Sequence, residues 1–238
     1  GIVLRDMEFM QFHPTTLYLA GASRALISEA VRGAGAKLRD RRGRAFMQDF
    51  HAMAELAPRD VVSRSILTHM LATRDTAVYL DCRKITGLPR KFPGLVRLCR
   101  KFRLDPAKDV IPVRPAAHYM IGGVRVDEWG RTTIRNLFAA GECAAAGFHG
   151  ANRLGSNSLL ECLVFGKRAG AVAAQEAHAP VPAVSFRGPK RGGLRPELDL
   201  DDIRNSLRHA MWRYVGIERE AGGLKYALDN IGFWSEYV

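Results

Sequence analysis

A glycine-punctuated loop that leads directly into a long helix most constrains what this chain can fold into. A short apolar strand is expected at 136–140, a loop at 143–157 and a helix from about residue 158 to 178. Ser158 and Glu161 form an S-x-x-E pattern, which predicts a capping box at the helix start. A strand, a glycine loop and a helix N-terminus in this order favour anion binding, because free backbone N–H groups and the positive end of the helix dipole face the loop.

The rest of the chain mixes short strands with helices. The clearest helix is expected at 58–73, where Val62, Ile66 and Met70 recur every four residues and Pro58 suits the first turn. The remaining predicted elements are a strand within 1–11, a short helix at 25–32, a hairpin turn at 40–43, strands at 76–81, 122–127 and 131–134, a helix at 94–102, a Pro- and Gly-rich linker at 179–196 and a helical region at 198–230.

Composition limits the class of protein. The chain has 238 residues, enough to bury a core as one large domain or two small ones. No window approaches the roughly 18 uncharged apolar residues of a membrane span, and the start lacks the features of a signal peptide. Cys82, Cys99, Cys143 and Cys162 are widely spaced, which predicts reduced thiols in a cytoplasmic protein and no metal site.

The formal net charge of +12 is concentrated in two runs, 32–44 and 83–103. A nucleic-acid binder and an attraction for anionic substrates are both compatible with such a charge. Neither run has the interleaved aromatic residues that base stacking needs, so we expect solvated faces and no nucleic-acid partner. A basic, non-catalytic binding module remains an alternative.

Several polar residues in loops are candidates for chemistry. Arg59 and Arg153 could each hold a carboxylate in a bidentate clamp, or form surface ion pairs. His13 and His118 each lie close to a proline, and a structural role is as compatible with that position as a functional one. Glu142, directly after a strand and a glycine, could contact a ribose hydroxyl or be a surface carboxylate. No spacing fits zinc, calcium or a Walker phosphate loop.

A set of motifs in fixed order carries a family resemblance. The motifs are QFHPT at 11–15, LAPRD at 56–60, RPAAHY at 114–119 with GG at 122–123, GE at 141–142, and HGANRLGSNSLLE at 149–161, with a weaker match, MWRYVGI, at 211–217. Together they resemble the L-aspartate oxidase family, which is related to the flavoprotein subunits of succinate dehydrogenase and fumarate reductase. The matches run from about residue 7 to residue 168.

The resemblance implies an α+β fold with three parts. These are a substrate-capping domain at 1–112, the closing strands and helix of an FAD-binding domain at 113–180, and a linker with a partial helical C-terminal domain at 181–238. The G-x-G-x-x-G segment with which such enzymes begin has no counterpart here, so the isolated chain could be an inactive fragment.

The resemblance also implies a reaction and its residues. L-Aspartate would be oxidised to iminoaspartate by hydride transfer to FAD, the first step of de novo NAD biosynthesis, and quinolinate synthase would take the product. Arg59 would orient the substrate and stabilise charge. One carboxylate would be bound by Gln11, His13 and Ser28, and the other by His118 and Arg153. Ser28 stands where the family usually has a threonine. FAD contacts are implied for Glu142, Asn157, Ser158 and Leu159. A succinate dehydrogenase or fumarate reductase flavoprotein, acting on succinate- or fumarate-type dicarboxylates, is the alternative within the superfamily.

Overall fold

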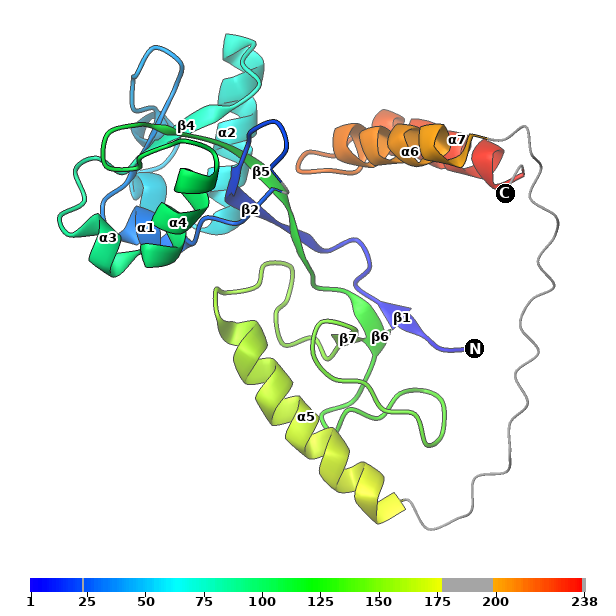
Figure 1. The fold of residues 1–238 in the computed structure, drawn as a ribbon. Coiled ribbons are helices and arrows are strands. Elements are labelled where there is room, and N and C mark those ends of the chain that lie inside the picture. The colour runs from blue at the N-terminus through cyan, green and yellow to red at the C-terminus, as the bar shows by residue number, and fades with distance from the viewer. Residues whose placement is uncertain (23, 177–198, 237–238) are drawn as a thin grey trace. The chain divides into compact units, whose positions relative to one another are not determined.

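The computed structural model describes residues 1–22, 24–176 and 199–236, which fall into two compact units, 1–176 and 177–238. The first unit combines helices and strands and the second is helical, as Figure 1 shows. The predicted α+β class with a helical C-terminal part is confirmed. The linker predicted at 179–196 lies outside the described residues.

The first unit contains two sheets. A four-stranded antiparallel sheet has the order β2-β5-β4-β3, and a three-stranded sheet has the order β1-β6-β7. The strands are β1 Leu4–Arg5, β2 Met10–Leu17, β3 Lys37–Arg39, β4 Val78–Asp81, β5 Ile111–Met120, β6 Gly123–Arg125 and β7 Ala144–Ala145. Strands β2 and β5 run side by side (Figure 1), and the expected domain boundary at residue 112 falls inside β5.

Helices cover the four-stranded sheet. They are α1 Glu29–Gly33, α2 Arg59–Thr73, α3 Leu88–Lys91 and α4 Pro93–Lys101, with 3₁₀ turns at Met47–Asp49 and Ala54–Leu56. Helix α2 packs on β2 and β5. As its periodicity predicts, Val62, Ile66 and Met70 are buried, and Pro58 occupies the N-cap position. The helix ends where Arg74 adopts a left-handed conformation with φ of 57°. This packing fixes the first turn of α2 beside β2.

Helix α5, Asn157–Glu176, follows the loop as expected. The capping box predicted at its start is not formed. Ser158 Oγ accepts from Arg153, and Glu161 contacts Tyr119 and His149, so neither side chain caps the helix start. The two side chains are used in contacts with other segments, and these contacts shape the site described below.

Other predictions need correction. No strand forms at 131–134 or 136–140, where only an isolated bridge joins Arg131 to Phe138, because Asn136 has a φ of 64° that breaks extended structure. The strand predicted within 1–11 is divided in two, because Asp6 has a φ of 58°. The short helix predicted at 25–32 starts only after Ser28, whose hydroxyl accepts from the Ala30 amide. The turn predicted at 40–43, the strand within 76–81 and the helix at 94–102 are confirmed.

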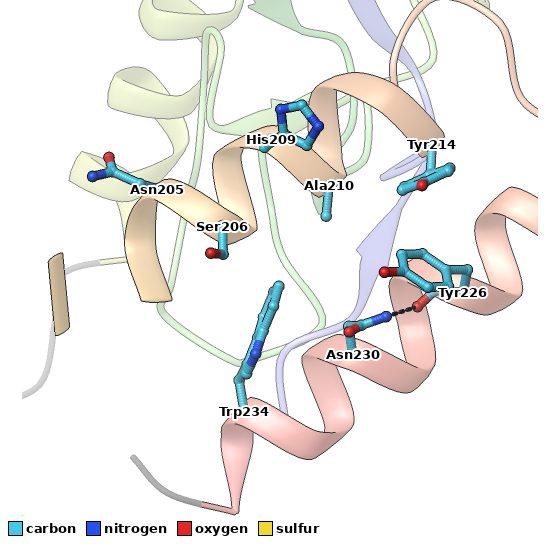
Figure 2. A pocket seen from close by; sticks show the side chains of 8 residues that line it. All are labelled: Asn205, Ser206, His209, Ala210, Tyr214, Tyr226, Asn230 and Trp234. Atoms are coloured by element: carbon cyan, nitrogen blue, oxygen red, sulfur yellow. Dashed lines mark hydrogen bonds between the residues drawn. The ribbon is translucent and has the colours of Figure 1, made fainter. Parts of the chain in front are cut away.

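The described residues of the second unit, 199–236, form two helices, α6 Leu200–Tyr214 and α7 Ala221–Ser235, within and just beyond the helical region predicted at 198–230. Asp199 caps α6 by accepting from two backbone amides. A cavity of about 430 Å³ lies between the two helices, and the ring centroids of Tyr214 and Tyr226 are 4.8 Å apart. Figure 2 shows the side chains that line it. The described side chains of the cavity are mostly polar or aromatic, and Asn230 donates to the Tyr226 carbonyl at 2.7 Å.

Candidate functional site

Four segments of the first unit bring the candidate residues together. Strand β2 supplies Gln11 and His13, β5 supplies His118, the first turn of α2 supplies Arg59, and the loop before α5 supplies Arg153. The β2–β5 ladder and the packing of α2 on it place these segments next to each other. Residues that are far apart in the sequence therefore form one polar cluster.

An irregularity in the β2–β5 ladder positions the two histidines. Gln11 pairs with Tyr119 and Phe12 with Ala117, so His118 is an extra residue in β5 and forms a β-bulge. A bulge turns a side chain out of the normal alternation of the strand. The His118 ring lies 5.3 Å from the His13 ring, centroid to centroid, with the planes at 78°. The two imidazoles therefore face the same space.

Gln11 is the centre of the cluster. Its side-chain oxygen accepts from Arg59 Nη1 at 2.9 Å and from Arg153 Nη1 at 3.0 Å. Its side-chain nitrogen donates to the Arg153 carbonyl at 2.6 Å and to Asn152 Oδ1 at 3.2 Å. Gln11 is buried, so this amide holds two guanidinium groups of like charge in fixed positions away from water.

Glu29 is a partner of Arg59 that the sequence analysis missed. Its two carboxylate oxygens accept from Arg59 Nε at 2.9 Å and Nη2 at 3.0 Å in a bidentate pair. The hydrogen bond from Arg59 lowers the pKa of Glu29. Its position directly after Ser28 was the available signal, but spacing alone gives no reason to pair it with an arginine thirty residues away.

The two histidines are held in their neutral form. Burial, followed by the charge of Arg59, lowers the pKa of His13 from 6.5 to about 3. Burial and the charges of Arg59 and Arg153 also lower the pKa of His118. Nδ1 of His13 accepts from the Thr15 amide at 3.3 Å, so the single proton of the neutral ring lies on Nε2. That Nε2 is buried without a protein partner in the described part of the chain, so its N–H is an unsatisfied donor.

Arg153 has a second unsatisfied donor. Its Nη2 donates to Ser158 Oγ at 2.6 Å, its guanidinium lies 4.3 Å over the Tyr119 ring, and its Nε has no hydrogen-bond partner among the described residues. Arg153 is buried, and an unpaired buried N–H is unfavourable. A negatively charged ligand in the cluster would satisfy both this N–H and that of His13.

The other residues expected in the site lie at the edge of the polar cluster or outside it. The Ser28 hydroxyl caps α1 by accepting from the Ala30 amide and makes no hydrogen bond to Gln11 or His13. Glu142 Oε1 accepts from the Met120 amide at 3.0 Å, at the end of β5. Asn157, Ser158 and Leu159 form the first turn of α5, and only Ser158 reaches the cluster, through Arg153.

The surface around the first turn of α5 fits a flavin. Leu154, Leu159 and Leu163 are about 70% exposed, directly beside the polar cluster. Cofactor sites combine large apolar surfaces with a few fixed polar groups. An isoalloxazine ring has apolar faces and polar edges, so these leucines and the helix N-terminus suit it.

The described part of the chain has neither the ligand cluster of a metal site nor a helix that could cross a membrane. No group of His, Cys, Asp or Glu residues there has the arrangement of a metal site. The helices of the described ranges are too short or too polar to cross a membrane. The four cysteines are free thiols, of which Cys82 and Cys99 are buried. Burial raises the pKa of Cys82 to about 12 and that of Cys99 to about 11, which makes both unreactive.

Comparisons with known sequences point to flavoproteins. The model of the FAD binding domain family matches residues 1–159. An L-aspartate oxidase from Nostoc sp. is 43% identical over 99% of the chain, which covers 43% of that protein. An L-aspartate oxidase from Mycobacterium leprae is 44% identical over 97% of the chain, which covers 44% of that protein. The chain thus spans less than half the length of the curated relatives it matches.

Two solved structures are also similar to this chain over its whole length. The quinol fumarate reductase FrdA of E. coli aligns with a TM-score of 0.85 and 33% identity, over 100% of the chain and 46% of FrdA. The Sdh1 complex of Mycobacterium smegmatis in the apo form aligns with a TM-score of 0.73 and 31% identity, over 100% of the chain and 42% of the Sdh1 chain.

Proposed function

The chain belongs to the FAD-binding domain family, and we propose that the protein carrying it is an FAD-dependent L-aspartate oxidase that produces iminoaspartate. One observation carries this proposal. Two arginines and two neutral histidines form one cluster, in which His13 Nε2 and Arg153 Nε are buried donors without a hydrogen-bond partner among the described residues. Such a set of donors is suited to a small molecule with two carboxylates.

The cluster gathers positive charge. Besides Arg59 and Arg153 it includes the buried Arg32, whose guanidinium lies 4.0 Å from Glu29, the carboxylate that also pairs with Arg59. L-Aspartate has two carboxylates and one ammonium group, and its net negative charge suits such a site. A carboxylate bound by a charged donor gains roughly 1.5–3 kcal/mol per hydrogen bond.

Each end of the substrate has its own binding residues in this proposal. Gln11, His13 and Ser28 bind one carboxylate, with His13 donating from Nε2. His118 and Arg153 bind the other, with Arg153 donating from Nε. Neutral imidazoles suit this arrangement, because each donates a hydrogen bond without adding a further positive charge beside Arg59.

Arg59 orients the reacting carbons in this proposal. Its bidentate pair with Glu29 and its bond to Gln11 fix the guanidinium plane. Oxidation of the ammonium form removes a hydride from Cα, forms the Cα–N double bond and releases one proton from nitrogen to solvent, which leaves the protonated imine. FAD, when bound, supplies the two-electron acceptor for that hydride. Asn157, Ser158, Leu159 and Glu142 are the proposed contacts to it.

The names of the relatives support the oxidase reaction, and the wider role is a further part of the proposal. We propose that the reaction is the first step of de novo NAD biosynthesis in the cytoplasm and that quinolinate synthase takes the product. The proposed division of the chain is a capping domain at 1–112, the closing part of the FAD-binding domain at 113–180, and a linker with a partial helical C-terminal domain at 181–238.

A second candidate is the flavoprotein subunit of a fumarate reductase or succinate dehydrogenase, which the likeness to FrdA favours. The two functions differ in substrate. The flavin-loaded enzyme is mixed anaerobically with L-aspartate or with succinate, and bleaching of the flavin absorbance is followed. Bleaching by aspartate alone supports the oxidase, and bleaching by succinate alone refutes it. No bleaching with either, together with salt-sensitive retention on heparin, would favour a basic binding module.

A further inference from the structure

Three buried polar side chains form a hydrogen-bonded group next to Arg153 and have no part in the reaction proposed above. They are Tyr119 on β5, His149 in the loop before α5, and Glu161 in the second turn of α5. The Tyr119 hydroxyl lies 3.1 Å from Glu161 Oε2, and His149 Nε2 lies 2.8 Å from the same oxygen. The side chains of His149 and Glu161 are 4% and 3% exposed. We call these residues the Glu161 network.

Burial of a carboxylate is unfavourable unless it is hydrogen-bonded and its charge is compensated. The Tyr119 hydroxyl donates to Glu161 Oε2, and His149 Nε2 lies at hydrogen-bond distance from the same oxygen. Burial and the negative charge of Glu161 raise the pKa of Tyr119, which keeps its hydroxyl protonated as a donor. The network therefore joins a strand, a loop and a helix through one carboxylate.

Arg153 lacks the carboxylate partner that Arg59 has. The side-chain acceptors of its hydrogen bonds, Gln11 Oε1 and Ser158 Oγ, are both neutral. Burial, together with the charge of Arg59, lowers the pKa of Arg153. The face of the Tyr119 ring lies 4.3 Å from the guanidinium carbon, and the hydroxyl at the edge of that ring contacts Glu161. The carboxylates of Glu142 and Glu29 also act on Arg153 through their charges.

We propose that Tyr119 and Glu161 are positioning residues for Arg153. Glu161 fixes the plane of the Tyr119 ring through the hydroxyl, and the ring supports the guanidinium by a cation–π contact, so that Nε stays directed at a substrate carboxylate. His149 holds Glu161 from the other side. The proposal rests on the proposed function, because it assigns Arg153 to carboxylate binding.

Substitutions separate the parts of the network. Tyr119→Phe keeps the ring and removes the hydroxyl, Tyr119→Leu removes the ring, and Glu161→Gln keeps the shape and removes the charge. Tyr79→Phe on β4 and Glu128→Gln on the surface are matched controls from outside the site. Thermal unfolding of each variant identifies any that fail to fold, and Tyr119→Phe, the mildest change, still tests the hydroxyl in that case.

The first readout is steady-state kinetics of the flavin-loaded enzyme. We expect KM for L-aspartate to rise about tenfold in Tyr119→Leu and severalfold in Tyr119→Phe and Glu161→Gln, with kcat within about twofold, because an interaction present in both ground and transition states affects KM. The double variant Tyr119→Leu/Glu161→Gln should be no worse than Tyr119→Leu, since both changes act through the ring. A general loss of folding would instead lower kcat at constant KM. Unchanged KM in Tyr119→Leu, or additive effects in the double variant, would overturn the proposal.

The second readout does not depend on the reaction. In the full chain, the Arg153 Nε–H signal in ¹⁵N NMR is assigned by its loss in Arg153→Lys. We expect this signal to be shifted by the Tyr119 ring current and to move towards the random-coil position in Glu161→Gln, but not in Glu128→Gln. An unmoved signal in Glu161→Gln refutes the network even in an enzyme that oxidises aspartate. A network that behaves as expected in a protein without aspartate activity would refute only the proposed function.

Discussion

Arg59 and Arg153 donate to the same atom, the side-chain oxygen of Gln11, at 2.9 and 3.0 Å. The two arginines come from a helix and a loop that are far apart in the sequence, and two like charges repel each other at this separation. Their shared acceptor, the Glu29 carboxylate and the Tyr119 ring offset that repulsion. A dicarboxylate in the space between them would offset it further, so the site is arranged to bind an anion.

Removal of the shared acceptor should weaken both the fold and the site. In Gln11→Leu two buried guanidinium groups lose one hydrogen bond each, so we expect the free energy of unfolding to fall by about 1–3 kcal/mol. Succinate binding, measured by calorimetry on the flavin-loaded enzyme, should weaken at least tenfold. Gln48→Leu, at an exposed position, is the control and should change neither quantity. Equal behaviour of the two variants would contradict the central role of Gln11.

His13 should stay neutral far below the usual range. We expect its imidazole signal in an NMR titration, assigned by its loss in His13→Asn, to titrate near pH 3 rather than 6.5. The unfolded chain binds a proton at higher pH than the folded one, so stability contributed by neutral His13 is present above about pH 6.5 and is lost as the pH falls towards 3. The slope is about 1.4 kcal/mol per pH unit. A titration near 6.5 would contradict the buried environment described here.

Glu29 should matter more for the reaction than for stability. Its side chain is 41% exposed, so loss of its charge in Glu29→Gln should cost less than about 1 kcal/mol of unfolding free energy. The guanidinium plane of Arg59 loses half of a charged bidentate pair, so we expect kcat for L-aspartate to fall at least tenfold. Glu128→Gln serves as the control. A variant with unchanged kcat would show that the orientation of Arg59 does not depend on this pair.

Burial along α2 makes a prediction about the fold alone. Ile66 is 0% exposed and Leu71, on the same helix, is 66% exposed. Ile66→Ala should lower the free energy of unfolding by about 2–5 kcal/mol, because it leaves a cavity in the core. Leu71→Ala should change it by no more than about 0.5 kcal/mol. Denaturant unfolding measures both, and similar losses in the two variants would mean that the helix packs by a different face.

The sequence allowed prediction of the elements whose pattern is local. The stripe on α2 and the glycine loop before α5 follow from side-chain spacing, and the structure has both. The short strand expected at 136–140 fails, because a left-handed residue such as Asn136 has no signal in hydrophobic periodicity. The capping box fails for another reason: Ser158 and Glu161 fit the local pattern, but distant partners use their side chains.

The site could be predicted only as a set of residue types. His13, His118, Arg59 and Arg153 were identified as candidates from motifs, and the structure brings them together. Their geometry depends on a β-bulge at His118 and on the shared acceptor Gln11. Neither feature can be predicted from the periodicity of the sequence. Glu29 was missed because its pairing with Arg59 is a tertiary contact.

The most direct test of the account is anaerobic reduction of the flavin-loaded enzyme by L-aspartate, with and without the Arg153→Leu change. The account predicts rapid bleaching of the native enzyme and no saturable bleaching by aspartate in the variant, although the variant retains its flavin. Bleaching of the variant with unchanged rate and unchanged aspartate dependence would contradict the claim that Arg153 holds the substrate.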